Sequence, residues 1–344
     1  MNVRGWGEIV LAVGLSIALA WPIGLHISRV WSRDPTFLDK ALEPLERGIY
    51  RLAGVDAERG QTWRDYALAM LAFNVAGFLT LYALVRFQQY LPLNPEHAAA
   101  MPPDLAFNLA MAFVTNTDWQ AYVAERDVSH LVQMAGLTTQ NFVSAGSGMA
   151  VASALSRAFA SRGRSAIGNF WADLVRNTLY VLLPLSIVVA IALAAIGVPQ
   201  TLLGHIDVHT IEGARQIITL GPVASQEAIK QIGTNGGGFF NANSAHPFEN
   251  PTPLSNLIEM VSMNAIGFAC GIAFGRVTRA SADARSLIIV MAMMVLAAAG
   301  LVYAAESQPT PALMSAHVTA SPNMEGKEVR FGAAGSAADR KSVV

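Results

Sequence analysis

The 344-residue sequence is 53% hydrophobic and only 14% charged, whereas soluble domains carry about 25% charged residues. This balance favours a membrane protein, and a formal net charge of −1 argues against a nucleic-acid partner. The single cysteine, Cys270, excludes a disulfide framework and a thiolate metal cluster. No GxxxxGK[ST] motif and no nucleophile–base pair stand out, so we expect no ATP hydrolysis by this chain alone and no organic cofactor.

Six stretches are long and apolar enough to cross a bilayer, which takes about 20 mainly apolar residues. They are Ile9 to Ile27, Tyr66 to Val85, Leu131 to Ala154, Asn177 to Ile196, Leu254 to Phe274, and Leu287 to Ala304. The first stretch could be a cleaved signal peptide, because Arg4 precedes its apolar core, but the apolar character continues to Ile27 and favours a retained helix. We therefore predict an all-α integral membrane protein with about six spanning helices.

Lysine and arginine concentrate in alternate connections between these spans. The connections after spans one, three and five hold fourteen, whereas the two longer connections between them hold four. Because basic residues mark cytoplasmic loops, we expect the N-terminus and the two longer loops to lie outside. Residues 42–52 of the first cytoplasmic connection could form an amphipathic helix at the membrane surface or remain a solvated loop.

The first outward loop contains an apolar stretch that is too short to cross the membrane. The ten residues Leu105 to Val114, with Asp104 as N-cap, would form a helix of about 15 Å, half a bilayer. Polar residues 115–120 follow, which is typical of a segment that enters the membrane and returns. We interpret Asp118 in this segment either as a rim charge that attracts cations or as a surface N-cap.

The second outward loop repeats the arrangement. Pro222 to Ile232 can form a short helix, and the Gly/Asn-rich residues 233–243 follow it. Thr-Asn recurs at Thr115-Asn116 and at Thr234-Asn235, each time after a short helix and before another span. This recurrence indicates an internal repeat of span, pore helix, filter strand and span, with two re-entrant pore helices in all.

The composition of the two loops favours a site that replaces the water around a monovalent cation. Consecutive glycines leave backbone carbonyls free to turn toward an ion, and rings of carbonyls replace its hydration shell. The negative ends of both helix dipoles would face the same site. Asn116, Gln120 and Asn235 could add neutral oxygens or brace the loops, whereas a divalent ion would recruit several carboxylates. A flexible surface loop would explain one Gly-Gly-Gly, but the pattern occurs twice.

Polar residues also occur within the predicted spans, where they are costly. They could support the filter strands, line a path, or only join helices by hydrogen bonds. The set comprises Asn74, Gln133, Thr138, Thr139, Gln140, Asn141, Ser144 and Asn264.

At these residues the chain resembles the KdpA family, the potassium-binding subunits of the Kdp-type potassium-transporting ATPases. The matching blocks are 113–120, 133–138, 140–142, 221–230, 233–251, 323–328 and 330–332. The resemblance implies a multi-pass protein of the bacterial inner membrane, related to potassium channels, with four span–pore–span repeats around one filter. By residue match, the resemblance assigns the potassium filter to Thr115, Asn116, Thr117 and Gln120 in the first repeat, and to Thr234, Asn235, Gly236, Gly237 and Gly238 in the second.

The resemblance also implies a transport complex. A protein of this kind takes periplasmic potassium, the transported substrate, and delivers it to the ATPase subunit (KdpB), which is a P-type ATPase that hydrolyses ATP. The implied assembly also includes KdpC and a small single-span subunit, with membrane lipid around it.

On this interpretation the chain divides into six parts: an N-terminal spanning helix (1–30), a cytoplasmic connector (31–64), a first repeat (65–156), a second repeat (172–275), the start of a third repeat (285–332) and an aberrant tail (333–344). The third pore helix should begin shortly after Phe331, but the last residues are polar and charged. We therefore expect a truncation by frameshift or premature stop, which would leave half of the filter and make transport by this chain alone doubtful. Two alternatives are a non-transporting membrane remnant and a secondary transporter with broken helices.

Overall fold

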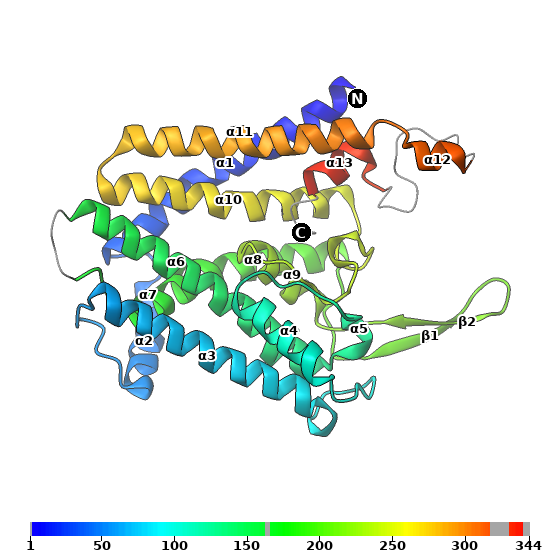
Figure 1. Ribbon diagram of the computed structural model, residues 1–344, viewed down its shortest axis with the longest axis horizontal. Helices are drawn as coiled ribbons and strands as arrows, with labels where there is room; N and C mark the ends of the chain where they lie inside the picture. Colours follow the sequence, from blue (N-terminus) through cyan, green and yellow to red (C-terminus); the bar gives the residue numbers. More distant parts are fainter. Residues whose placement is uncertain (1, 162–165, 317–329, 340–344) are drawn as a thin grey trace.

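The computed structural model describes residues 2–161, 166–316 and 330–339, and these residues are mainly helical (Figure 1). In chain order the elements are α1 (Val3–Ser32), α2 (Asp39–Ala53), α3 (Trp63–Phe87), η1 (Gln88–Tyr90), α4 (Pro103–Val114), α5 (Ala124–Asp127), η2 (Val132–Thr138), α6 (Thr139–Ala160), α7 (Phe170–Arg176), η3 (Asn177–Leu182), α8 (Leu183–Ile196), β1 (His205–His209), β2 (Arg215–Thr219), α9 (Val223–Ile232), η4 (Asn243–Ala245), α10 (Pro253–Thr278), α11 (Ser281–Glu306), α12 (Pro311–Ser315) and α13 (Gly332–Asp339).

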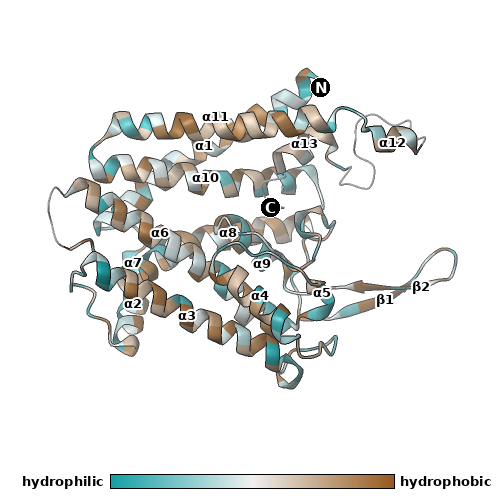
Figure 2. Cartoon of the chain, in the orientation of Figure 1, coloured by the Kyte–Doolittle hydropathy of each residue, from teal (hydrophilic) through white to brown (hydrophobic). Residues whose placement is uncertain are grey.

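Among the described residues, five helices are long and apolar enough to cross a membrane: Val3–Ser32, Trp63–Tyr90, Phe170–Ile196, Pro253–Thr278 and Ser281–Ser315. They match five of the six predicted spans, and Figure 2 shows the apolar residues along α3 and α11. Each helix begins earlier than predicted, because its more polar first residues are also helical. The all-α fold class is therefore confirmed, and the chain is a multi-pass membrane protein.

The remaining predicted span, residues 131–154, is also helical but is not among those five. It consists of η2 and α6, which follow each other without a break. Its polar residues Gln133, Asn141 and Ser144 are buried against other parts of the protein rather than exposed to lipid. This helix can therefore have a low hydropathy, because its polar side chains contact other parts of the protein and not lipid.

Helices α1 and α10 pack along each other, and α11 lies beside both (Figure 1). Small residues allow the close approach: a Cβ atom on Gly24 of α1 would lie only 2.7 Å from Cβ of Ile272 in α10. Ala20, Ile27, Ala269 and Ile272 belong to the core cluster between these helices. Close contact through small residues is the usual way for membrane helices to associate.

The connections between spans gather at the two ends of the helix layer. Residues 33–62, 166–169 and 279–280 lie at one end, and residues 91–102, 197–222 and 307–310 lie at the other (left and right in Figure 1). Residues 42–52 are part of α2, so the helical alternative for this stretch is confirmed. The buried Glu46 fastens α2 to the helix that spans residues 170–196, accepting hydrogen bonds from Arg176 at 3.1 Å and from Tyr180 at 2.6 Å.

The sequence did not predict the β-hairpin of β1 and β2, which projects from the helical body (Figure 1). Its strands pair antiparallel, with Ile206 opposite Ile218. The alternation of polar and apolar residues in His205–His209 is a strand signal, although a short one.

Part of the segment predicted to be an aberrant tail is helical, and its aberrant origin stays a prediction. Residues up to Asp339 form α13, which packs against α1, α10 and α11 and buries Ala334 and Ala337. Small residues make this packing possible, because Ala334 and Ala337 join the apolar cluster around Ile9 and Tyr303. The matching block 323–328 and residues 340–344 lie outside the described residues.

Candidate functional site

Helix α4, the first predicted pore helix, runs inward from the end that carries the β-hairpin (Figure 1). It begins with Pro102 as N-cap and Pro103 as its first residue. Asp104 was predicted as the N-cap, and this is wrong: it lies inside the first turn. The reason is that proline fits the first helical position well, while a carboxylate in the first turn still interacts favourably with the helix dipole.

Helix α9, the second predicted pore helix, ends in the same way as α4. Each helix is followed by a residue with left-handed backbone, Asn116 with φ of 61° and Thr234 with φ of 52°. Such a residue ends a helix and turns the chain. When Thr115-Asn116 is superimposed in sequence on Thr234-Asn235, Asp118 corresponds to Gly237, and both have positive φ, 53° and 63°. Asp118 lies two residues after Asn116, whereas Gly237 lies three residues after Thr234, so the left-handed positions are not in one constant register. The two re-entrant loops, defined here as residues 115–120 and 233–240, therefore share a left-handed residue just after the helix but not the same backbone conformation throughout.

The two re-entrant loops are joined by hydrogen bonds with a constant offset of 118 residues. Asn116 Nδ2 donates to Thr234 O at 3.4 Å, and Gly236 N donates to Asp118 Oδ2 at 3.3 Å. Gln120 makes two bonds with Gly238: its Nε2 donates to the carbonyl at 2.9 Å, and its Oε1 accepts from the amide at 3.1 Å. Alternate side chains of the first loop thus bind alternate backbone positions of the second. We call this set of contacts the side-chain ladder.

The helix formed by η2 and α6 supports the side-chain ladder from behind. Ser144 Oγ donates to Asn116 Oδ1 at 2.8 Å, and the Asn141 amide, in the orientation that satisfies its hydrogen bonds, donates to Asp118 Oδ1 at 3.0 Å. Gln133 Nε2 donates to Phe239 O at 3.4 Å. Of the roles open to the polar residues of this helix, support of the loops is therefore realised at these three positions.

The predicted site residues are brought together, but several side chains act as braces. Asn235 Nδ2 donates to Asn116 Oδ1, so the amides of both loops bind each other. Thr115 and Thr117 lie on the exposed side of the first loop, with their hydroxyl oxygens 3.1 Å apart, and Thr234 is also exposed. The uncharged oxygens of these threonines and of the loop backbone are the groups that remain for a ligand.

Asp118 is neither a rim charge nor a surface N-cap, and both interpretations are wrong. Its side chain is 1% exposed. The left-handed backbone at this residue directs the carboxylate inward, where the amide of Gly236 and the side chain of Asn141 donate to it. Sequence reasoning missed this role because only the sign of φ decides where the carboxylate points.

The three consecutive glycines are required by close packing. A Cβ atom on Gly236 would lie 3.1 Å from Thr117 O, and one on Gly237 would lie 2.8 Å from Asp118 O. At Gly238 it would lie 2.5 Å from Glu249 Oε1. Gly236, Gly237 and Gly238, called here the glycine strand, are therefore held between the first loop and Glu249. Because these residues have no Cβ atoms, no side chain of their own crowds their carbonyls.

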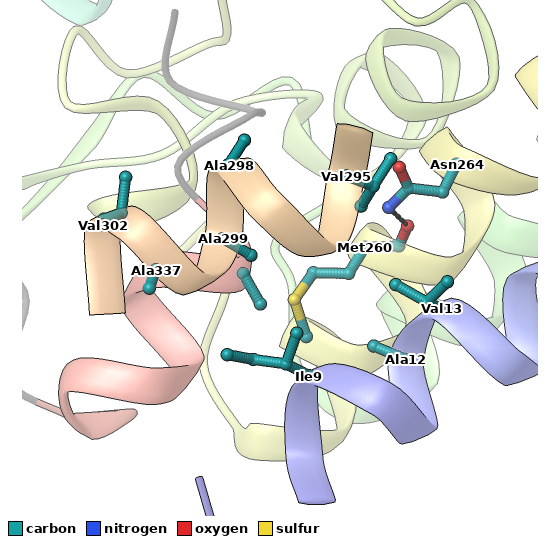
Figure 3. Close-up of a pocket in the computed structure, with 11 residues that line it drawn as sticks. Ile9, Ala12, Val13, Met260, Asn264, Val295, Ala298, Ala299, Val302 and Ala337 are labelled. Carbon is teal, nitrogen blue, oxygen red and sulfur yellow. Dashed lines mark hydrogen bonds between the residues drawn. The ribbon is translucent and has the colours of Figure 1, made fainter. Parts of the chain in front are cut away.

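Among the described residues there is no group of three or more His, Cys, Asp or Glu side chains that could hold a metal ion. A cavity of about 590 Å³ between α1, α10, α11 and α13 is lined by apolar residues (Figure 3). Its one amide, Asn264, already donates to Met260 O at 2.8 Å. This cavity suits hydrocarbon rather than a cation.

Comparison with known proteins identifies the family. Residues 10–339 match the family described as the potassium-transporting ATPase A subunit. Two proteins named potassium-transporting ATPase potassium-binding subunit, from Beijerinckia indica and Caulobacter vibrioides, are 58% identical over 337 residues and 54% identical over 338 residues, respectively. These alignments cover 98% of this chain but only 59% of each relative, so the chain spans about three-fifths of their length. The chain belongs to the potassium-transporting ATPase A subunit family.

Proposed function

We propose that this chain supplies a potassium-binding, channel-like part of an ATP-driven potassium uptake complex. The side-chain ladder carries the proposal, because it holds together two loops whose backbone carbonyls and threonine hydroxyls supply uncharged oxygens inside a membrane protein. Uncharged oxygens in a fixed arrangement can replace the hydration shell of an alkali cation. The proposed filter residues are Thr115, Asn116, Thr117, Gln120, Thr234, Asn235, Gly236, Gly237 and Gly238.

In this proposal the ion passes the side of the loops that carries the exposed Thr115, Thr117 and Thr234. Residues 65–156 and 172–275 form two repeats and supply two sides of the ion path. The alignments cover 59% of each relative, so further residues of a full-length relative would complete the path there.

The energy for transport comes, in the proposal, from a separate P-type ATPase, KdpB, which works together with KdpC and a small single-span subunit. Support comes from the relatives, which are named as subunits of a potassium-transporting ATPase. The chain itself hydrolyses no ATP and needs no organic cofactor, and potassium is its substrate.

We place the chain in a bacterial inner membrane with its N-terminus and both re-entrant loops on the periplasmic side. The distribution of basic residues supports this orientation. Labelling of single cysteines in a Cys270→Ser background tests it, since Ile211 in the hairpin and Leu52 in α2 are both highly exposed. We expect an impermeant thiol reagent outside intact cells to label Ile211→Cys and not Leu52→Cys. The reverse pattern would overturn the orientation.

Ion-dependent stability tests the binding function. The chain in lipid nanodiscs is heated in potassium, sodium or choline chloride of equal ionic strength. A bound ion at 100 times its dissociation constant stabilises by about 2.7 kcal/mol, so we expect the highest unfolding midpoint in potassium. The double variant Thr115→Ala/Thr117→Ala should lose most of this difference. The control Thr139→Ala removes a hydroxyl that bonds only to Met134 O, and it should keep the difference. Equal midpoints in all three salts would refute the proposal.

A further inference from the structure

A cluster of charged and polar side chains lies buried behind the second re-entrant loop. Lys230 and Glu227 of α9 meet Glu249 and Ser244 from the following segment, and all four side chains are completely buried. The sequence around Lys230 matches the family, but neither the lysine nor Glu249 is among the proposed filter residues.

The ammonium group of Lys230 donates hydrogen bonds to Glu249 and Ser244 and forms a further ion pair with Glu227. It lies 2.6 Å from Glu227 Oε2, 3.0 Å from Glu249 Oε2 and 3.1 Å from Ser244 Oγ. A buried charge persists only when it is paired and hydrogen-bonded in this manner. The positions of both carboxylates are therefore fixed by the lysine.

Glu249 connects this cluster to the far end of the second re-entrant loop. Its Oε1 accepts a hydrogen bond from the backbone amide of Phe240 at 2.7 Å. The same oxygen occupies the space where a side chain on Gly238 would begin, 2.5 Å from the ideal Cβ position. The carboxylate thus contacts the glycine strand on the side opposite the side-chain ladder.

Lys230 also holds the near end of the loop, through its backbone. Its carbonyl accepts from the amide of Asn235 at 3.0 Å. One residue of α9 therefore fixes both ends of the segment 235–240: Asn235 directly, and Phe240 through Glu249. The carbonyls of Gly236, Gly237 and Gly238 lie between these two anchor points.

We propose that Lys230 and Glu249 form a charged brace that sets the spacing of the glycine carbonyls and thereby the preference for potassium over sodium. This inference rests on the proposed function. Both are positioning residues, since Phe240 and the loop backbone separate them from the ion path. The brace acts from behind the strand, while Asp118 and Gln120 act from the other side.

The test combines two variants of Glu249 with a matched control. Glu249→Gln keeps an oxygen for the Phe240 amide but presents an uncharged amide to Lys230. Glu249→Asp keeps the charge but is too short to reach both partners. Asp173→Asn is the control, because Asp173 forms a buried ion pair with Arg157 that makes no contact with either re-entrant loop.

The first readout is the ratio of potassium to sodium affinity of the chain in nanodiscs, measured from ion-dependent stability. We expect both Glu249 variants to lower this ratio about tenfold, the effect of losing a hydrogen bond to a charged group. Asp173→Asn should lower the unfolding midpoint without changing the ratio. An unchanged ratio in Glu249→Gln and Glu249→Asp would overturn the inference.

The second readout is amide hydrogen exchange in choline chloride, which does not depend on ion binding. We expect the amides of residues 235–240 to exchange about tenfold faster in both Glu249 variants than in the unaltered chain. The Asp173→Asn control should exchange these amides at the unaltered rate. If the unaltered chain binds no potassium, the proposed function fails and with it the effect on ion preference. The exchange rates then still decide whether the brace holds the strand, and unchanged rates would refute it.

Discussion

Replacing Gly237 by alanine probes whether the glycine strand is required by close packing. Gly237 has φ of 63°, and a Cβ atom there would lie 2.8 Å from Asp118 O and 3.0 Å from Phe113 Cζ. The left-handed backbone alone costs an L-residue about 1–2 kcal/mol. Forcing the neighbours apart costs about 1–3 kcal/mol more. We expect Gly237→Ala to lower the free energy of unfolding by about 2–5 kcal/mol.

Two other glycines separate these contributions. Gly54 ends α2 with φ of 65°, and a Cβ atom there meets nothing within 4 Å, so Gly54→Ala should show only the backbone cost. Gly148 lies in α6 with equally open surroundings and ordinary helical backbone, and Gly148→Ala should stabilise by about 0.5–1 kcal/mol. Unfolding free energies from titration with sodium dodecyl sulfate in mixed micelles compare the three. The reasoning is refuted if Gly237→Ala costs no more than Gly54→Ala.

Three further substitutions test the contacts that position the loops. Gln120→Ala removes both hydrogen bonds to Gly238 and should speed exchange of the Gly238 amide by about tenfold or more. The control Gln89→Ala, at an exposed position, should leave that rate unchanged, and equal rates in the two variants would contradict the side-chain ladder. Asp118→Ala should lower the free energy of unfolding by about 1–3 kcal/mol, and Asp118→Asn should lower it by less, because asparagine retains an acceptor for the Gly236 amide. A denaturant titration compares the two variants, and the opposite order would show that the charge itself matters. Asn169→Ala removes the N-cap bonds to Trp171 and Ala172 and the bonds that the same amide donates to the carbonyls of Asp56 and Arg59, and we expect a loss of at least about 0.5–2 kcal/mol in the same titration. No loss would show that water replaces these bonds.

The helices of this protein could be predicted because their signals are local. A run of about 20 apolar residues has few alternatives to a spanning helix. The two short helices were also found, since each is apolar or amphipathic and leads into a polar loop. The helix of η2 and α6 was predicted in spite of its polar residues, and the structure shows that Ser144 and Asn141 are needed in place of apolar groups because they bind the first loop.

The contacts between the loops could not be predicted to the same depth. The recurrence of Thr-Asn indicates that the loops are alike, but it does not state that Asp118 meets Gly236 or that Gln120 meets Gly238. Those pairings depend on positive φ at Asn116 and Asp118, and the enrichment of asparagine and aspartate at positive φ is too weak a signal to predict it at a given position. The burial of Lys230 was likewise not predicted: Glu227 lies only three residues earlier in α9, but the second carboxylate, Glu249, lies 19 residues further along the chain.

The two re-entrant loops are related by sequence but have complementary tasks in the structure. The first contributes side chains, Asn116, Asp118 and Gln120, and the second contributes backbone amides and carbonyls. Side chains on both loops would collide, because the ideal Cβ position of Gly237 is only 2.8 Å from Asp118 O. If both loops consisted of glycine, no side chains would hydrogen-bond one loop to the other, and the two loops would lose their register. An exchange of the two loop sequences should therefore destroy the site, although each sequence already exists in the protein next to a helix of similar length.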